Sequence, residues 1–193
     1  MMHKKVNLFL ILISFLWMAC EKTQKTEWED PSTFQINQEM PRANFFPFES
    51  EELALINKPS ESKYYLSLNG QWKFNLSSNP KEREKSFYKE TFDDAKWPEI
   101  TVPGSWELQG WSVPIYLDEE YPFTPNPPFV PHDYNTVGAY RKSFIIPQNW
   151  NGREVFIRFG SVRSAFYLWI NGKKVGYGPV SYTHLTLPTT PYV

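Results

Sequence analysis

Acidic side chains that could serve as general acids or bases gather near the middle of this 193-residue chain. They are Glu107, Asp118, Glu119, Glu120 and Asp133. Hydrolytic acid–base catalysis requires groups that converge on one substrate atom. A run of adjacent acids such as residues 118–120 is instead typical of a solvated face. The spacing of these residues therefore identifies no catalytic pair.

Histidine and cysteine are too sparse to predict a metal site. His3, His132 and His184 are isolated in the sequence, and a zinc or iron site needs clustered ligands. His132 is followed by Asp133, a pair more typical of a loop hydrogen bond than of a ligand site. The sequence also has no phosphate-binding loop, dinucleotide fingerprint or nucleophile motif. We expect no metal and no cofactor in this chain.

Prolines and aromatic residues alternate between Pro114 and Pro131. Proline fixes φ and removes a hydrogen-bond donor, so this segment cannot be helix interior or central strand. We expect a stiff, largely extended loop whose rings pack on a scaffold or face a ligand. Asn126 lies between two prolines, and its amide can both donate and accept hydrogen bonds. An Asn in such a loop is equally typical of a turn.

The amino terminus reads as an export signal. Positive charge in residues 1–5 precedes an apolar run, residues 6–18, that is too short for an ordinary membrane span. Cys20, the one cysteine of the chain, follows Ala19 as in a bacterial lipobox, although Trp17 and Met18 depart from that pattern. We expect lipidation of Cys20, with ordinary secretion as the alternative. The expected location is the periplasm or the outer membrane of a Gram-negative bacterium.

Composition and patterning predict an all-β domain. The formal net charge of −1 gives no reason to expect nucleic-acid binding. Aromatic residues make up 18% of the chain, which suits a ring-rich core more often than sugar stacking. Hairpins are predicted at Asn69-Gly70, between YYLSL and QWKFNL, and at Asn171-Gly172, between AFYLWI and KKVGY. Alternating strands are predicted at residues 139–146 and 153–159, with Val155, Ile157 and Phe159 on one face.

One short helix is predicted ahead of these strands. Ser50 would be its N-cap, acids would fill its first turn, and Leu53 and Ile56 would pack inward. The polar residues before it, from Glu21 to about Asp30, read as a tether.

Four segments in order resemble one known family. They are LNGQWKFNL (68–76), FDDAKWPEITVPGSWELQGW (92–111), PIYLDEEYPFTPNPPFVPHDYNTVGAYRKSF (114–144) and FGSVRSAFYLWINGKKVGYG (159–178). The chain is similar to the beginning of bacterial β-galactosidases of glycoside hydrolase family 2. The resemblance implies a jelly-roll β-sandwich of the galactose-binding-domain type, incomplete here at its C-terminal side.

The resemblance also implies where chemistry occurs. Family members hydrolyse terminal β-D-galactosides by a retaining mechanism, with both carboxylates on a (β/α)₈ barrel that this chain lacks. The Asn of the NPPFVP motif, here Asn126, reaches into that active site and contacts the galactosyl hydroxyls. Magnesium and sodium ions of the family bind outside this segment, and relatives are often homo-oligomers. The alternatives are a free-standing carbohydrate-binding or adhesion module, or another family-2 glycosidase such as a glucuronidase or mannosidase.

The end of the chain departs from the family pattern. Residues 180–189, VSYTHLTLPT, equal the translation of a transposase mosaic end used as a sequencing adapter. We therefore divide the chain into a lipoprotein-type signal (1–19), a tether and extension (20–62), a partial jelly-roll sugar-binding domain (63–179) and an adapter-derived tail (180–193).

Overall fold

The protein is mostly β, as predicted. The computed structural model describes residues 26–40, 45–114, 123–163, 165–178 and 183–186. In these ranges the strands are β1 (Gly70–Ser77), β2 (Glu99–Val102), β3 (Val137–Arg141), β4 (Phe156–Phe159), β5 (Phe166–Ile170), β6 (Lys173–Gly178) and β7 (Thr183–Thr186). The helical elements are η1 (Glu27–Glu29), α2 (Glu51–Ile56), η2 (Pro59–Glu61) and η3 (Gln148–Trp150). None of the described helices has the length and apolarity needed to cross a bilayer.

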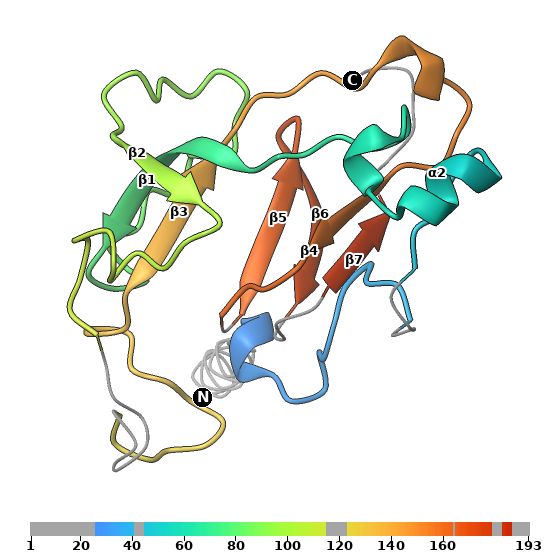
Figure 1. Cartoon of the computed structure of the whole chain (residues 1–193). Coiled ribbons are helices and arrows are strands. Elements are labelled where there is room, and N and C mark those ends of the chain that lie inside the picture. The colour runs from blue at the N-terminus through green and yellow to red at the C-terminus, as the bar shows by residue number, and fades with distance from the viewer. Residues whose placement is uncertain (1–25, 41–44, 115–122, 164, 179–182, 187–193) are drawn as a thin grey trace, which may run out of the picture.

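The strands form three antiparallel groups (Figure 1), in the orders β2-β1-β3, β4-β7 and β5-β6. The β5–β6 hairpin is the predicted one. Asn171 and Gly172 both have positive φ, 48° and 75°, as a two-residue hairpin turn requires. The strand β4 pairs with β7, which lies within the part of the chain interpreted as a tail.

The predicted hairpin at Asn69-Gly70 is wrong. Residues 64–68 form no strand, and β1 pairs instead with β2 and β3, both distant in sequence. In the structure, side chains hydrogen-bond to backbone carbonyls on both sides of Asn69-Gly70, where a hairpin would have paired its two strands. The indole N–H of Trp72 donates to the carbonyl of Leu68 at 2.8 Å, and Lys142 Nζ donates to the carbonyl of Gln71 at 3.1 Å. The strand predicted for residues 139–146 also ends early, at Arg141.

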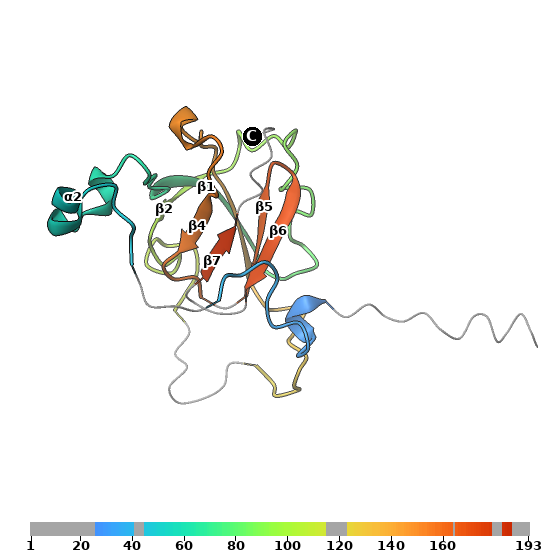
Figure 2. The ribbon, with the colours of Figure 1, turned by 90° about the vertical axis from the view of Figure 1, so that its right-hand side faces the viewer.

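Helix α2 begins as predicted. Ser50 Oγ accepts a hydrogen bond from the N–H of Leu53 at 3.3 Å, and Asn57 ends the helix in the left-handed conformation. The expected inward packing of Ile56 is wrong, because its side chain is 52% exposed. The helix lies at the periphery of the molecule (Figure 2), with no sheet against its outer face.

Phe74 of β1 is the centre of an aromatic cluster and is 0% exposed. The rings of Tyr140, Trp111 and Trp106 lie 4.7, 4.9 and 6.1 Å from it, centroid to centroid. Tilted and edge-on contacts of this kind add to the free energy of burial. Trp106 and Trp111 therefore pack against the buried ring of Phe74.

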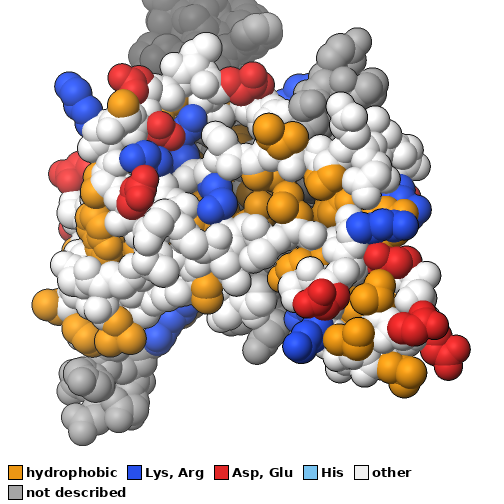
Figure 3. All heavy atoms as spheres, turned by 45° about the horizontal axis from the view of Figure 1, so that its top comes forward, with side chains coloured by type: hydrophobic (Ala, Val, Ile, Leu, Met, Phe, Trp, Pro, Cys, Tyr) orange, Lys and Arg blue, Asp and Glu red, His pale blue; other side chains and the backbone are white. Residues whose placement is uncertain are grey.

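A second core lies between β4 and the β5–β6 hairpin. Val155, Ile157 and Val175 are buried in it, and Phe159 packs against them. Val155, Ile157 and Phe159 thus share the face that their alternation predicted. On the face shown in Figure 3, hydrophobic side chains are interspersed with charged ones.

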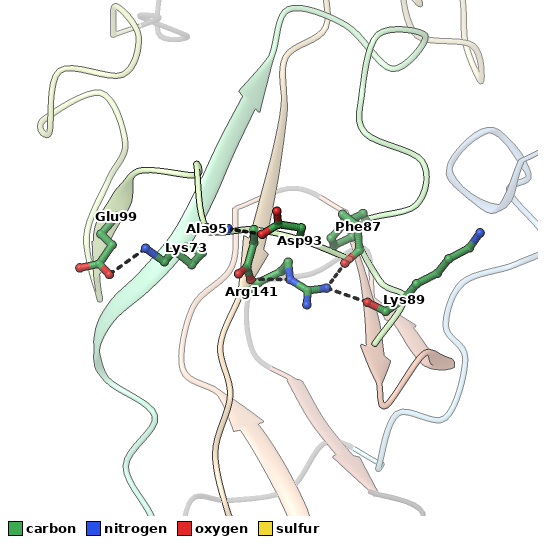
Figure 4. A network of polar contacts seen from close by, with 8 residues as sticks. Lys73, Phe87, Lys89, Asp93, Ala95, Glu99 and Arg141 are labelled. Carbon is green, nitrogen blue, oxygen red and sulfur yellow. Dashed lines mark hydrogen bonds and ion pairs between the residues drawn. The ribbon is translucent and has the colours of Figure 1, made fainter. Parts of the chain in front are cut away.

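One arginine connects β3 to the long segment between β1 and β2 (Figure 4). Arg141 Nε donates to Asp94 Oδ2 at 2.7 Å, and its Nη1 donates to the carbonyls of Phe87 and, at 3.2 Å, Lys89. The guanidinium fork suits this task because it presents several donors in one plane. The Arg141 side chain is 21% exposed, so these bonds are partly shielded from water.

Candidate functional site: the proline loop and its strap

Asn126 lies at an exposed corner of residues 123–136, which we call the proline loop. The described loop contains no helix or strand, in agreement with the prediction for a proline-rich segment. The N–H of Phe129 donates to the carbonyl of Asn126 at 2.8 Å and closes a turn around Pro127 and Pro128. The structure thus holds the Asn126 backbone in a turn while leaving the residue accessible.

Aromatic rings connect the two limbs of the proline loop. Phe123 and Tyr134 lie 5.6 Å apart, centroid to centroid. Tyr134 is 49% exposed and Phe129 is 45% exposed. The loop therefore presents aromatic surface beside Asn126, which is the composition expected of a surface that meets a sugar or another domain.

A second segment lies beside this loop. Residues 26–37, which we call the strap, run along the β5–β6 hairpin (Figures 1 and 2). Ile36 and Tyr177 exchange backbone hydrogen bonds of 3.0 and 3.2 Å. The Asn37 amide donates to the carbonyl of Val175 at 3.0 Å. The strap is thereby fixed to the edge of the domain.

Glu27 adds a polar anchor at the other end of the strap. It accepts a hydrogen bond from the hydroxyl of Tyr167 at 2.9 Å and forms an ion pair with Lys174. The Lys174 ammonium is the main cause of the lowered pKa of the Glu27 carboxyl. Burial, followed by the hydrogen bond to Glu27, raises the pKa of Tyr167. Both shifts favour the protonation states in which this contact is made.

Glu29 connects the strap to the proline loop. Its side chain is 10% exposed, and its Oε1 lies 2.6 Å from Nε2 of His132. The Thr26 hydroxyl donates to the other carboxylate oxygen at 3.1 Å. The ring of Trp28 lies 5.2 Å from the His132 ring, tilted by 41°. Trp28 and Glu29 of the strap thus both contact His132 of the proline loop.

Burial raises the pKa of the Glu29 carboxyl, but its hydrogen bonds reverse the effect. The His132 ring, the Thr26 hydroxyl and the Val130 amide all stabilise the carboxylate, so its pKa lies below the ordinary value. The carboxylate is therefore the form that the folded protein selects, and it contacts the proline loop at His132.

A hollow of about 240 Å³ opens where the strap meets the loop, bordered by Trp28, Phe34, Pro128 and Tyr177. The carboxylates on its rim are already engaged by protein groups, as described above for Glu27 and Glu29. Within the described residues, no three His, Cys, Asp or Glu side chains lie close enough together to hold a metal ion.

Among the other candidate acids, Glu107 makes its hydrogen bonds within its own short segment. Glu107 accepts hydrogen bonds from the Ser105 hydroxyl and the Trp106 indole. Burial raises its pKa, and these two bonds bring it below the ordinary value. Residues 118–120 and Cys20 lie outside the described residues, as does His3. His184 lies in β7, opposite Arg158 of β4.

Sequence reasoning did not identify the roles of Glu29 and His132. His132 was expected to bond within its loop near Asp133, whereas it contacts a residue 103 positions earlier. Glu29 was assigned to a polar tether, yet it is 8% exposed. The available signal was Trp28, a large ring out of place in a solvated tether.

Comparisons with known proteins agree with the motifs. A model of the family described as glycosyl hydrolases family 2, sugar binding domain, matches residues 65–193. A β-galactosidase of Priestia megaterium is 41% identical over 172 residues, covering 86% of this chain and 17% of the relative. One of Psychromonas ingrahamii is 42% identical over 151 residues, covering 78% and 14%. The chain thus spans less than a fifth of the length of these relatives.

A solved structure was also compared. The β-glucuronidase of Bacteroides uniformis aligns at a TM-score of 0.44 and 25% sequence identity, over 66% of this chain and 13% of that chain.

Proposed function

Because the chain belongs to the glycosyl hydrolase family 2 sugar-binding domains, we propose that it is the amino-terminal domain of an exported β-galactosidase. Two curated relatives that cover over three quarters of the chain are both β-galactosidases. The domain would be a jelly-roll sandwich completed by residues beyond those described.

In this account the domain contributes to a site built mainly elsewhere. The retaining mechanism needs a nucleophilic carboxylate and an acid/base carboxylate about 5–5.5 Å apart. We place both on a catalytic barrel outside this chain, together with any magnesium or sodium sites. Asn126 reaches that site from the proline loop and hydrogen-bonds the galactosyl hydroxyls. The match of Asn126 to the Asn of the family's NPPFVP motif supports the assignment, and its exposed position in the turn closed by Phe129 leaves it accessible.

An amide is suited to sugar recognition because each hydroxyl is both a donor and an acceptor. The Asn126 carboxamide offers two N–H donors and one acceptor oxygen. The turn around Pro127 and Pro128 fixes its backbone before substrate arrives, which reduces the entropy lost on binding. The neighbouring aromatic surface of Phe129 would pack against the barrel or the sugar.

Export and anchoring complete the proposal. The apolar run that ends at Ala19 and Cys20 would direct lipidation of Cys20. The mature enzyme would then be held at a membrane by its lipid alone, in the periplasm or at the outer membrane, as a homo-oligomer.

Substrate preference tests this function. The complete protein should be expressed from the uninterrupted gene and assayed on nitrophenyl β-D-galactoside, β-D-glucuronide and β-D-mannoside. We expect kcat/KM to be greatest for the galactoside. Preference for the glucuronide or mannoside would contradict the assignment. A gene that encodes no barrel downstream would make the chain a carbohydrate-binding module instead.

A further inference from the structure

The proline loop is held from outside by the strap, and Glu29 is central to that contact. Glu29 is the one buried carboxylate among the described residues. Burying a charged group is costly unless it is fully hydrogen-bonded. Its partners come from the strap itself, through Thr26, and from the loop, through His132. The loop must therefore stay in place for this carboxylate to remain satisfied.

The strap can hold the proline loop in place because the strap is itself bound to the β5–β6 hairpin at two other points. Glu27 contacts Tyr167 and Lys174 of the β5–β6 hairpin, and Ile36 pairs with Tyr177 of β6. Glu29 lies between these anchors. The Glu29 carboxylate thus connects the edge of the β5–β6 hairpin, through the strap, to the proline loop, which contains no strand. Sites positioned on regular elements are more precise than sites on unsupported loops.

Asn126 and His132 belong to the same short stretch of that loop. The turn closed by Phe129 lies between them. The prolines of this stretch restrict backbone rotation, so a constraint at His132 also restricts Asn126. Trp28 packs against the His132 ring and keeps it oriented toward Glu29.

We propose that Glu29 and His132 form a positioning pair that fixes the proline loop and so places Asn126 for galactoside binding. Neither residue is catalytic, because both act through the loop. The fixing of the loop stands on the contacts described here, and its consequence for substrate rests on the proposed function.

The test uses the full-length enzyme with Glu29→Gln, His132→Ala and the double variant. Hydrogen exchange is followed in peptides covering residues 123–136. We expect exchange to accelerate roughly tenfold in each single variant, as the loss of a charge-assisted hydrogen bond implies. The double variant should exchange no faster than the faster single variant, because the two residues act through one contact. Glu29→Asp should recover part of the protection.

Glu49→Gln is the matched control. Glu49 also accepts bonds from a neighbouring segment, the Ser62 hydroxyl at 2.6 Å and the Lys63 amide at 3.0 Å, but it contacts no described part of the proline loop. This variant should leave exchange in residues 123–136 unchanged.

Steady-state kinetics separate positioning from general stability. We expect the pair variants to raise KM for a β-galactoside several-fold while kcat changes little, the pattern of lost uniform binding. Unchanged loop exchange in both single variants, or additive effects in the double variant, would overturn the pair. Faster exchange with unchanged KM would overturn the positioning role if Asn126→Ala raises KM. If Asn126→Ala leaves KM unchanged, the proposed function fails. Hydrogen exchange in residues 123–136 then decides whether Glu29 and His132 fix the loop.

Discussion

The backbone N–H of Phe129 donates to the carbonyl of Asn126 at 2.8 Å, and the two residues enclose the Pro127–Pro128 turn. This bond fixes the corner at which the Asn126 side chain is exposed. The strap then fixes the same loop at His132. We therefore attribute the proposed galactoside recognition to the proline loop and not to the tryptophans of the core. The Phe129–Asn126 bond constrains this loop internally, and the strap constrains it at His132.

Gly138 of β3 lies where no side chain fits. A Cβ built there would be 2.5 Å from Cζ3 of Trp106 and 3.0 Å from Cε2 of Phe74. We expect Gly138→Ala to destabilise the domain by about 1–3 kcal/mol, because both rings belong to the packed aromatic cluster. The measurement is the rate of protease cleavage within residues 65–178 of the full-length protein.

Gly160 provides the control for this prediction. A Cβ at Gly160 meets nothing within 4 Å. Gly160→Ala should therefore leave the cleavage rate near that of the wild type. Equal cleavage of Gly138→Ala and Gly160→Ala would show that Trp106 and Phe74 do not pack against β3 as described.

We expect the Arg141 side chain to contribute more than the Lys73 side chain to the free energy of unfolding. Arg141 joins Asp94 and two backbone carbonyls, whereas Lys73 forms one ion pair among the described residues, with Glu99 at 3.2 Å, and these two side chains are 34% and 51% exposed. We expect Arg141→Met to cost about 2 kcal/mol, since it leaves several polar groups unpaired. Lys73→Met should cost less than about 1 kcal/mol.

Trypsin cleavage at Lys89 provides the readout for both variants. Arg141→Met should release the segment that contains Lys89, whose carbonyl Arg141 binds at 3.2 Å, and speed its cleavage. Lys73→Met should not. If the two variants were cleaved alike, the Arg141 contacts would have no role in holding that segment.

Local patterns predicted local structure well. The Ser50 cap of α2, the Asn171-Gly172 turn and the buried face of β4 were all readable from short windows. Two of the failures share one cause, which is contact between residues distant in sequence. β1 pairs with β2 and β3 across long intervals of sequence, and Glu29 meets His132 103 positions away. Turn chemistry at Asn69-Gly70 predicted a neighbouring partner, but pairing was decided by packing around Phe74.

The candidate site was predictable only in part. The proline pattern predicted the loop, because proline restricts conformation locally, whereas Asn126 was singled out by the resemblance of its NPPFVP motif to the family. The strap was missed because polar residues such as Glu27 and Glu29 look solvated until their partners are known, and Trp28 was the one signal against that interpretation.

Acid should release the strap. The folded-state pKa values of Glu27 and Glu29 are both lowered, by Lys174 above all for Glu27 and by hydrogen bonds that outweigh burial for Glu29. Their stabilisation is complete above the unfolded carboxyl pKa, about 4.5, and is lost as the pH falls through the lowered values. Hydrogen exchange in residues 26–37, corrected for the intrinsic effect of pH, should accelerate relative to the core on acidification below pH 4.5.

A variant with Glu27→Gln and Glu29→Gln tests this origin of the pH dependence. Its strap should exchange rapidly at neutral pH and show little further acceleration in acid. An acid response as large as that of the wild type would assign the effect to other groups.

Cys20 is expected to carry the lipid. Labelled palmitate supplied to a Gram-negative host should enter the full-length protein, because the apolar run ending at Ala19 is followed by a polar segment. Cys20→Ser should abolish labelling. Labelling that persists in Cys20→Ser would refute lipidation at this residue.

The central claim is that Asn126 binds the galactosyl unit, and kcat/KM of Asn126→Ala in the full-length enzyme tests it most directly. A lost hydrogen bond costs about 0.5–1.5 kcal/mol, so kcat/KM for a β-galactoside should fall roughly two- to tenfold, and further if a buried partner is left unpaired. Thr124→Ala, an exposed change in the same loop, is the control and should retain wild-type activity. A kcat/KM for Asn126→Ala equal to that of Thr124→Ala and the wild type would contradict the account.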